Sequence, residues 1–183
     1  TWTAGTSQNP AVAVDSSAGI HVVWQDDAPG DKEIYYKRST DGGTTWTTSQ
    51  RLTWTAGTSR NPAIAVDASN NLHVVWDDDQ SGGLEIYYMK STDGGTSWSA
   101  SQRLSWTSIS PWYPAIAIDS FGSLYVVWHD WGPGNNEIYY IKSPDGGTTW
   151  TSTHRLTWTS GSSTFPAIYV DSLDGLHLVW QDD

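Results

Sequence analysis

A 52-residue repeat runs along the whole chain and constrains its fold more than any other feature of the sequence. Three residue types each recur in four copies at this interval: Trp24, Trp76, Trp128 and Trp180; Asp15, Asp67, Asp119 and Asp171; and Pro10, Pro62, Pro114 and Pro166. Repeats of about this length are typical of solenoids, propellers and arrays. The 183 residues are therefore expected to form one repetitive domain with a sizeable core.

Each repeat unit contains four short runs of strand-forming residues. In the second unit these runs cover residues 62–66, 72–76, 85–90 and 98–106, with turns or glycine-bearing loops between them. No run shows the periodicity of a helix. Four short strands per unit are typical of a β-propeller blade, and the alanines of the first run suit the crowded innermost strand. We therefore predict an all-β fold.

The repeat predicts a β-propeller of four-stranded antiparallel blades, with about three and a half blades in this chain. We expect a single domain over residues 1–183, divided into blades over 8–55, 60–107 and 112–159 and a half blade over 164–183. The opening segment Thr1-Trp2-Thr3 matches residues 53–55, the tail of a fourth strand. Because propellers usually close with four to eight blades, we expect a homo-oligomer or a part of a longer chain.

Three copies of one eight-residue motif stand between the third and fourth runs of their units. They begin at Ser39, Ser91 and Ser143, and all contain Asp-Gly-Gly-Thr and end in tryptophan. Asp-Gly-Gly between strand-forming runs is a strong hairpin signal, because the carboxylate accepts backbone N–H groups and glycine tolerates positive φ. The closing tryptophan can fold over the turn and bury a large apolar face.

The motif resembles the Asp box, also called the bacterial neuraminidase repeat, of sialidases and related propeller proteins. Two copies match it in full: Ser39, Asp41, Gly43, Thr45 and Trp46, and Ser143, Asp145, Gly147, Thr149 and Trp150. The middle copy keeps Ser91, Asp93, Gly95 and Trp98, and it has Ser97 where the family prefers threonine. The resemblance implies a propeller in which these boxes have a structural role, away from the active site.

Charge and hydropathy exclude several classes of partner. The formal net charge is −11, which argues against a nucleic-acid partner, because proteins that bind nucleic acids present a basic surface. No apolar run approaches the ~18 residues that a membrane-spanning helix needs. From the habit of the family and the acidic, cysteine-free composition we expect a secreted or extracellular protein.

The third unit diverges from the first two mostly on the face where the family binds its ligands. Residues 108–113 and 129–135 replace segments that are similar in the other units, and they bring two tryptophans, a tyrosine and a histidine. Aromatic platforms beside polar groups can hold a pyranose by stacking and hydrogen bonding. The candidate ligand-binding residues are Trp112, Tyr113, His129, Asp130, Trp131, Arg60 and Asp78.

The same aromatic residues allow a second interpretation. Exposed aromatic clusters often mark interfaces between proteins. In that case the rings would plug the central channel or contact a partner chain. The uniformity of the other blades favours this architectural role, in which the module is a scaffold that assembles with others.

A repeated aspartate supports a different hypothesis. It occupies one position in four units, as Asp26, Asp78, Asp130 and Asp182. A catalytic residue belongs to one site, so fourfold repetition favours a structural turn or a ring of cation sites. We assign no metal and expect no cofactor, although calcium is compatible with such oxygen ligands.

Sialidase chemistry has little support in these residues. In the family, three arginines surround the substrate carboxylate, a Tyr–Glu pair supplies the nucleophile and an aspartate is the acid/base. Here Arg51, Arg103 and Arg155 are repeat equivalents on predicted outer strands, which favours a structural role. We therefore assign no catalytic residue and predict a non-enzymatic carbohydrate-binding or scaffold module. The alternative is a fragment of a sialidase-like glycoside hydrolase whose active site lies in missing blades.

Overall fold

The computed structural model describes residues 3–106, 110–132 and 134–183, and every regular element in them is a β-strand. Among these residues, no helix has the length and apolar character needed to cross a membrane. The first two sheets contain β1 (Ser7–Val14), β2 (Ile20–Asp26), β3 (Glu33–Ser39) and β4 (Gln50–Arg51), then β5 (Ser59–Val66), β6 (Leu72–Asp78), β7 (Glu85–Ser91) and β8 (Gln102–Arg103). The other two contain β9 (Pro111–Ile118), β10 (Leu124–Trp131), β11 (Asn136–Ser143) and β12 (His154–Arg155), then β13 (Ser163–Val170) and β14 (Leu176–Asp182).

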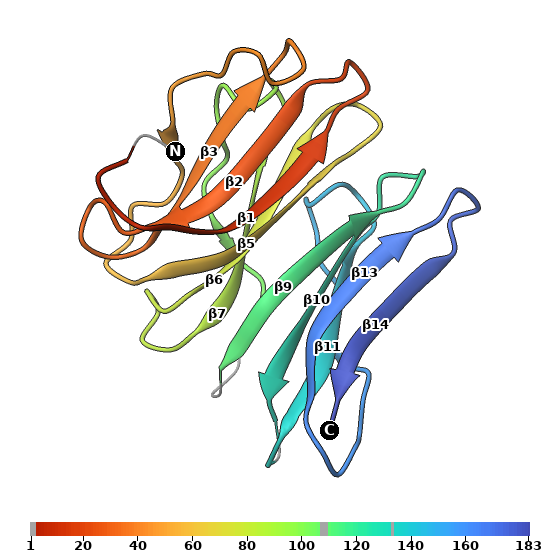
Figure 1. The fold of residues 1–183 in the computed structure, drawn as a ribbon. Helices are drawn as coiled ribbons and strands as arrows, with labels where there is room; N and C mark the ends of the chain where they lie inside the picture. Colours follow the sequence, from red (N-terminus) through yellow and green to blue (C-terminus); the bar gives the residue numbers. More distant parts are fainter. Residues whose placement is uncertain (1–2, 107–109, 133) are drawn as a thin grey trace.

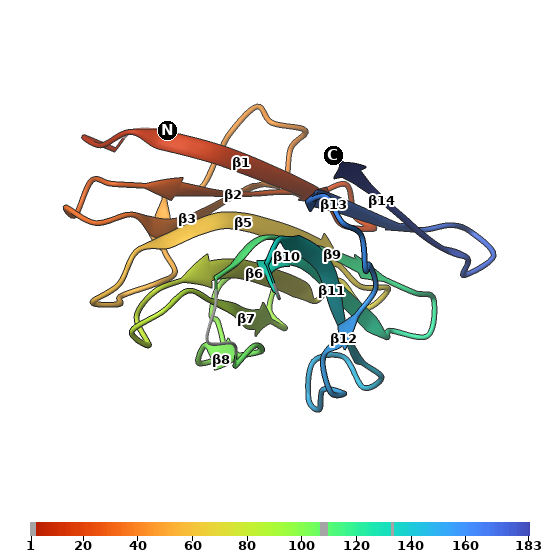
Figure 2. The same cartoon turned by 90° about the horizontal axis from the view of Figure 1, so that it is seen from below.

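Each sheet is an antiparallel meander in which consecutive strands pair. The first strands of the four sheets, β1, β5, β9 and β13, lie side by side at the centre of the molecule, and the sheets fan outward from them (Figure 1). Figure 2 shows the same sheets from below, with the blade of β1–β3 against the blade of β5–β7. The predicted all-β propeller of four-stranded blades is confirmed, with three complete blades and a half blade in the described residues. The domain bounds stay a prediction.

The core lies between neighbouring blades, because successive side chains of a strand point to opposite faces of its sheet. Val23 of the first blade packs against Val74 and Trp76 of the second. Val75, on the other face of β6, packs in the next interface with Trp128 of the third blade. Burial of each such side chain contributes about 1.5–3 kcal/mol. The strand β6 is therefore buried along its whole length.

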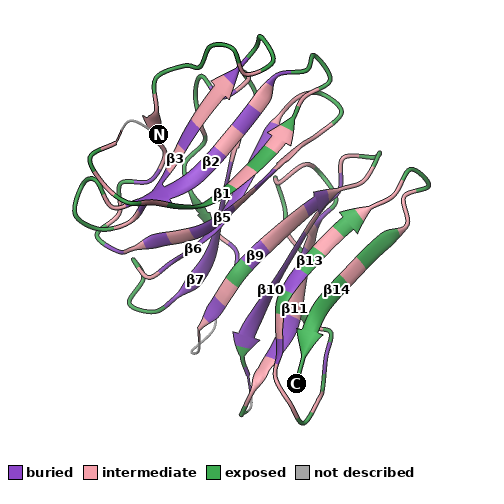
Figure 3. Ribbon diagram, in the orientation of Figure 1, coloured by how far each residue is buried: buried purple, intermediate pink, exposed green. Residues whose placement is uncertain are grey.

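The half blade of β13 and β14 has the same sequence pattern and far less burial (Figure 3). Val179 is 66% exposed and Trp180 is 42% exposed, whereas Val75 and Trp76, at the same repeat positions, are 0% exposed. The difference arises because β14 pairs with β13 alone and has no further blade against it among the described residues.

The Asp-Gly-Gly turns close on hydrogen bonds within the motif. In the first turn, Asp41 accepts the backbone N–H of Thr45 at 2.8 Å and its hydroxyl at 2.5 Å. The Trp46 Nε1 donates to the Gly43 carbonyl at 3.0 Å. The bonds from the Thr45 hydroxyl and N–H lower the pKa of Asp41 to about 2. The other two turns repeat the bonds from positions equivalent to Thr45.

The turns of the second and third blades also meet the preceding blade. The Tyr36 hydroxyl donates to the Gly94 carbonyl at 3.2 Å, and a Cβ added to Gly95 would lie 2.1 Å from the Tyr36 oxygen. Gly95 also has a φ of 86°, which favours glycine. In the first blade, the atom nearest to a Cβ on Gly43 is 3.8 Å away. The close approach of the neighbouring blade therefore adds a second reason for glycine at position 95.

The fourth strand is shorter than predicted. The prediction of a strand run over residues 98–106 is wrong in length, because β8 contains only Gln102 and Arg103. Among the described residues, β8 is the outermost strand of its blade and pairs with β7 alone, and the residues before it are small and exposed. The equivalent strands β4 and β12 also have two residues each. A very short edge strand discourages pairing with other chains.

Candidate ligand-binding site

The strand registers place two kinds of loop at opposite ends of the blades. Ser7 at the start of β1 pairs with Asp26 at the end of β2, and Asp26 pairs with Glu33 at the start of β3. At the other end of β2, Ile20 pairs with Ser39, where the Asp-Gly-Gly turn begins. The connections between blades therefore share one end with the β2–β3 loops, and the Asp-Gly-Gly turns lie at the opposite end.

At the loop end, each innermost strand carries a bulge residue directly before the repeated proline. These residues are Asn9, Asn61, Tyr113 and Phe165, with φ angles of 49°, 51°, 52° and 51°. The strand register shifts at this point in all four blades. The four residues and the prolines after them line a shallow hollow of about 240 Å³. The innermost strands thus meet around one cavity.

A hydrogen bond to the preceding blade fixes three of the bulge residues. The bonds run from the N–H of Asn61 to Gln25 Oε1 at 2.8 Å, from that of Tyr113 to Asp77 Oδ1 at 3.3 Å, and from that of Phe165 to His129 Nδ1 at 3.3 Å. The three acceptors occupy one repeat position. The backbone contact is therefore kept from blade to blade while the acceptor side chain changes.

Aromatic rings converge at the inner end of the third blade. The centroid of the Tyr113 ring lies 4.8 Å from that of Phe165 and 5.6 Å from that of His129. Trp112 stacks on Tyr113 at 6.4 Å, and the Arg60 guanidinium carbon lies 5.5 Å from the centre of the Trp112 ring. The structure therefore brings together four of the predicted site residues, and Phe165 joins them. We refer to these five residues as the axial cluster.

Burial sets the protonation of two groups that bond the bulge residues. It lowers the pKa of His129 to about 4, so the ring is neutral near pH 7. Because its Nδ1 accepts the Phe165 N–H, Nε2 carries the proton. Burial raises the pKa of Asp77 to about 7. This carboxyl is 0% exposed, and in the described part of the chain its Oδ2 has no hydrogen-bond partner. The Asp77 side chain therefore holds the backbone of Tyr113 and does not face solvent.

Three predicted site residues lie outside the axial cluster. Asp78 is 0% exposed and accepts a serine hydroxyl of β5 at 2.5 Å. Asp130, its equivalent in the third blade, is 2% exposed. This burial favours the structural interpretation of the repeated aspartate. Trp131 is 51% exposed at the end of β10. Of the diverged loops, residues 108, 109 and 133 lie outside the described residues.

Sequence reasoning missed Phe165, Asp77 and Asn61 as members or supports of the site. The available signal was the residue before each repeated proline, where Tyr113 and Phe165 depart from the asparagine of the first two units. The described residues contain no group of three or more His, Asp or Glu side chains that could hold a metal ion. The axial cluster and its supports consist of aromatic, guanidinium, amide and carboxyl groups.

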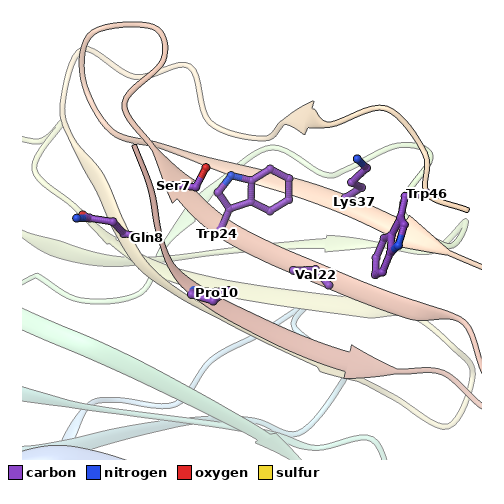
Figure 4. A pocket seen from close by; sticks show the side chains of 7 residues that line it. All are labelled: Ser7, Gln8, Pro10, Val22, Trp24, Lys37 and Trp46. Carbon is purple, nitrogen blue, oxygen red and sulfur yellow. The ribbon is translucent and has the colours of Figure 1, made fainter. Parts of the chain in front are cut away.

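A second hollow, of about 400 Å³, lies on the outer face of the first blade (Figure 4). Its lining residues are Ser7, Gln8, Pro10, Val22, Trp24, Lys37 and Trp46. In the second blade the equivalent surface is covered, and Trp98 meets the Tyr36 ring edge-on at 5.1 Å. The second hollow is therefore an uncovered blade interface.

Comparison with known proteins finds likeness in structure and none in sequence. No protein-family model and no curated protein matches the chain. A Hadza microbial sialidase matches with a TM-score of 0.78 at 17% identity, over 97% of this chain and 42% of that chain. The chain therefore shares the β-propeller fold of that structure. An α-L-arabinanase of Penicillium chrysogenum matches this propeller with a TM-score of 0.77 at 15% identity, over 96% of this chain and 57% of that chain.

An α-L-arabinofuranosidase of Fusarium graminearum also matches the propeller, with a TM-score of 0.76 at 14% identity, over 96% of this chain and 56% of that chain. The propeller in this chain thus spans about half the length of these three structures. At such low identity the likeness concerns the arrangement of the blades. Function has to be argued from the chemistry of the axial cluster.

Proposed function

We propose that this propeller is a non-enzymatic, Asp-box carbohydrate-binding module that works outside the cell and holds a sugar at the axial cluster. The observation that carries the proposal is the presence of Tyr113 and Phe165 at two of the four bulge positions. Asn9 and Asn61 occupy the equivalent positions in the first two blades. The hollow between the innermost strands therefore has aromatic residues on one side and asparagines on the other.

The two aromatic residues strain the backbone. A φ near 50° is well tolerated by asparagine, whereas it is unfavourable by about 1–2 kcal/mol for other L residues. Such strain persists where the surrounding structure fixes it, and it gathers at ligand sites. The aromatic residues at positions 113 and 165 are therefore better explained by a function than by random sequence drift in the third and fourth repeat units.

The hollow has an aromatic side and an amide side, which suits a sugar. Tyr113 and Phe165 are 39% and 52% exposed, so their rings are accessible to a ligand. An apolar ring face can stack on the C–H face of a pyranose. On the other side, Asn9 Nδ2 donates to Asn61 Oδ1 at 2.6 Å, and the remaining donor and acceptor capacity of these amides can bind hydroxyl groups.

The carboxyl groups that contact the axial cluster do not favour hydrolysis: Asp77 is buried, and Asp79 is paired with Arg60 at 3.1 Å. A glycosidase needs two carboxyl groups about 5–10 Å apart beside the scissile bond. Asp77 is 0% exposed, and it accepts the Asn61 amide at 2.8 Å and the Tyr113 N–H at 3.3 Å. The alternative, a fragment of a sialidase-like glycoside hydrolase, would have to draw its carboxylates from blades outside this sequence.

The similar structures support a carbohydrate as the class of ligand. Two of them were solved with arabinobiose, and a third is a sialidase. Arabinobiose is the ligand of the first two structures. For this propeller they support a carbohydrate ligand without indicating which one.

A glycan array on the purified chain and on the double variant Tyr113→Asn/Phe165→Asn tests the proposal. The variant restores the asparagines of the first two blades, so it relieves strain and should keep the fold. We expect the parent to bind defined glycans and the double variant to bind them about tenfold less tightly or worse. Trp131→Ala, outside the axial cluster, is the matched control and should bind like the parent.

Two results of the array would contradict the proposal. One is equal binding by the parent and the folded double variant, and the other is a blank array for the parent. A parallel array in EDTA shows whether a cation takes part in glycan binding. Loss of binding in EDTA would make the repeated aspartates candidate ligands of that cation.

A self-associating scaffold is the second candidate function, and the uncovered blade faces favour it. Val12 and Val14 are 63% and 59% exposed on the first blade, and Val179 is 66% exposed on the half blade. Two such apolar faces would cover each other in a head-to-tail homo-oligomer. Light scattering at micromolar concentration tests this, and a monomeric mass would rule the scaffold out.

A further inference from the structure

One exposed tryptophan follows the fourth strand in each complete blade. Trp54, Trp106 and Trp158 are 75%, 71% and 70% exposed. The second blade is covered on both faces, and its Trp106 is as open as the other two. Trp46 behaves differently, because it is 40% exposed on the uncovered face of its blade whereas its equivalent Trp98 packs against the first blade. The three exposed rings are therefore a property of every complete blade.

Each of these rings lies over an arginine. The distances from the guanidinium carbon to the ring centre are 4.0 Å for Arg51 and Trp54, 5.7 Å for Arg103 and Trp106, and 5.5 Å for Arg155 and Trp158. The guanidinium covers one face of the indole, and the high exposure leaves the rest of the ring open to solvent. We refer to the three pairs as the rim platforms.

The arginines of the rim platforms are held in place from within the blade. The Arg51 Nε donates to the Thr53 carbonyl at 2.7 Å, and its Nη2 donates to Glu33 at 2.5 Å. Glu33 is 1% exposed and also accepts the Thr53 hydroxyl. Glu85 and Glu137 hold the other two arginines in the same way. Because a buried glutamate already balances each arginine, a rim platform and its glutamate together carry no net charge.

We propose that the rim platforms are three equivalent binding sites for neutral pyranose units, separate from the axial cluster. A flat indole face suits the C–H face of an uncharged sugar ring. An acidic sugar would find the arginine already paired, and the net charge of −11 on the chain would repel it. The cation–π contact also holds the ring in one orientation, so little side-chain entropy is lost when a ligand binds.

Because there are three rim platforms, one polymeric ligand can bind several of them at once. A single ring contact changes affinity by about 2- to 10-fold. Several such contacts on one rigid fold can raise the affinity for a polymeric ligand by about 10²–10⁴ over one site. The ligand class is therefore a neutral polysaccharide with many pyranose units. Trp2 occupies the same repeat position and lies outside the described residues.

Affinity electrophoresis tests the rim platforms. Native gels that contain hydroxyethyl cellulose, galactomannan or laminarin are run beside polymer-free gels and gels that contain polygalacturonate. We expect retardation of the parent in at least one neutral gel and none in polygalacturonate. Each single substitution to alanine should weaken the apparent affinity about 2- to 10-fold. The triple variant Trp54→Ala/Trp106→Ala/Trp158→Ala should migrate as in the polymer-free gel.

Controls separate this site from the fold and from the axial cluster. Phe121→Ala removes a ring that is 83% exposed at the opposite, turn end of its blade, and it should be retarded like the parent. The double variant Tyr113→Asn/Phe165→Asn should also be retarded, because it leaves the rim platforms unchanged. The triple variant should keep the circular dichroism spectrum of the parent, since all three side chains are exposed. Two results would overturn the proposal: a parent that is unretarded in every neutral gel, or equal retardation of the folded triple variant.

Discussion

The first and second blades have nearly the same sequence and different surroundings. Residues 7–14 and 59–66 form the same innermost strand, with a register shift at the same place. Val12 is 63% exposed, whereas Ile64, at the same repeat position, is 8% exposed. Local sequence thus sets the strand and its register, and the presence of a preceding blade sets the burial. One substitution made at equivalent positions should therefore have unequal effects in the two blades.

The largest difference in stability between the two blades is expected when one apolar side chain of the innermost strand is replaced by alanine. Ile64→Ala should lower the free energy of unfolding by about 2–5 kcal/mol, because it leaves a cavity between the first two blades. Val12→Ala should change it by no more than about 0.5 kcal/mol, because that side chain is already exposed. Urea unfolding followed by circular dichroism measures both. Equal losses would show that the outer face of the first blade is covered in solution, which would favour the scaffold.

The second largest difference in stability is expected for the second glycine of the Asp-Gly-Gly turns. Gly95→Ala should lower the free energy of unfolding by about 2–4 kcal/mol, since the added Cβ meets the Tyr36 oxygen and φ is 86°. Gly43→Ala retains only the strain of a φ of 90° and should lower it by about 1–2 kcal/mol. Urea unfolding gives both values. Losses of equal size would mean that Tyr36 moves aside at little cost.

A pH dependence should distinguish Asp77 from Gln25, the neutral residue at the same position in the first blade. The pKa of Asp77 is about 7 in the folded protein, against an ordinary value of 3.8. The folded state therefore binds more protons than the unfolded chain between these values. The stability from this group is full below pH 3.8 and is lost as pH rises to about 7. Each unit of difference is worth about 1.4 kcal/mol.

The variant Asp77→Gln installs the residue of the first blade and tests this dependence. It should remove the fall in stability between pH 4 and 7 and should be more stable than the parent at pH 8 by about 1 kcal/mol or more. Urea unfolding at a series of pH values measures it. A variant that keeps the slope of the parent would assign the titration to another group.

The smallest effect is expected for a single hydroxyl between the first two blades. Tyr36→Phe removes the bond to the Gly94 carbonyl and the bond to His21 Nδ1 at 2.7 Å, and it should lower the free energy of unfolding by about 1 kcal/mol. Tyr140→Phe, at the same position facing the half blade, should lower it by less than about 0.5 kcal/mol. Thermal unfolding suffices for this comparison. Indistinguishable melting temperatures for the two variants would show that the bonds to Tyr36 contribute little.

The strands and turns could be predicted because their signals are local. The turn at Asp41 closes on bonds to residues at most four positions away, so its chemistry is visible in one short stretch. The length of β8 could not be predicted in this way. It depends on how far the outermost strand can stay beside β7, and that is a property of the whole twisted sheet.

The candidate site could be predicted only in part. Trp112, Tyr113 and His129 were found because the third unit departs from the others in these loops. Phe165 and Asp77 were missed because each meets Tyr113 across a blade boundary, and the sequence does not state which residues of neighbouring blades touch.

By itself, the sequence determined the four-stranded unit, its Asp-Gly-Gly turns and the repeated arginine, glutamate and tryptophan of the rim, because each of these features is complete within one 52-residue repeat. The tertiary structure alone decided which apolar faces are covered, that four bulge residues surround one hollow, and that Asp77 is fully buried. These outcomes depend on contacts between different repeats, and the distances of such contacts are set by how one blade packs on the next.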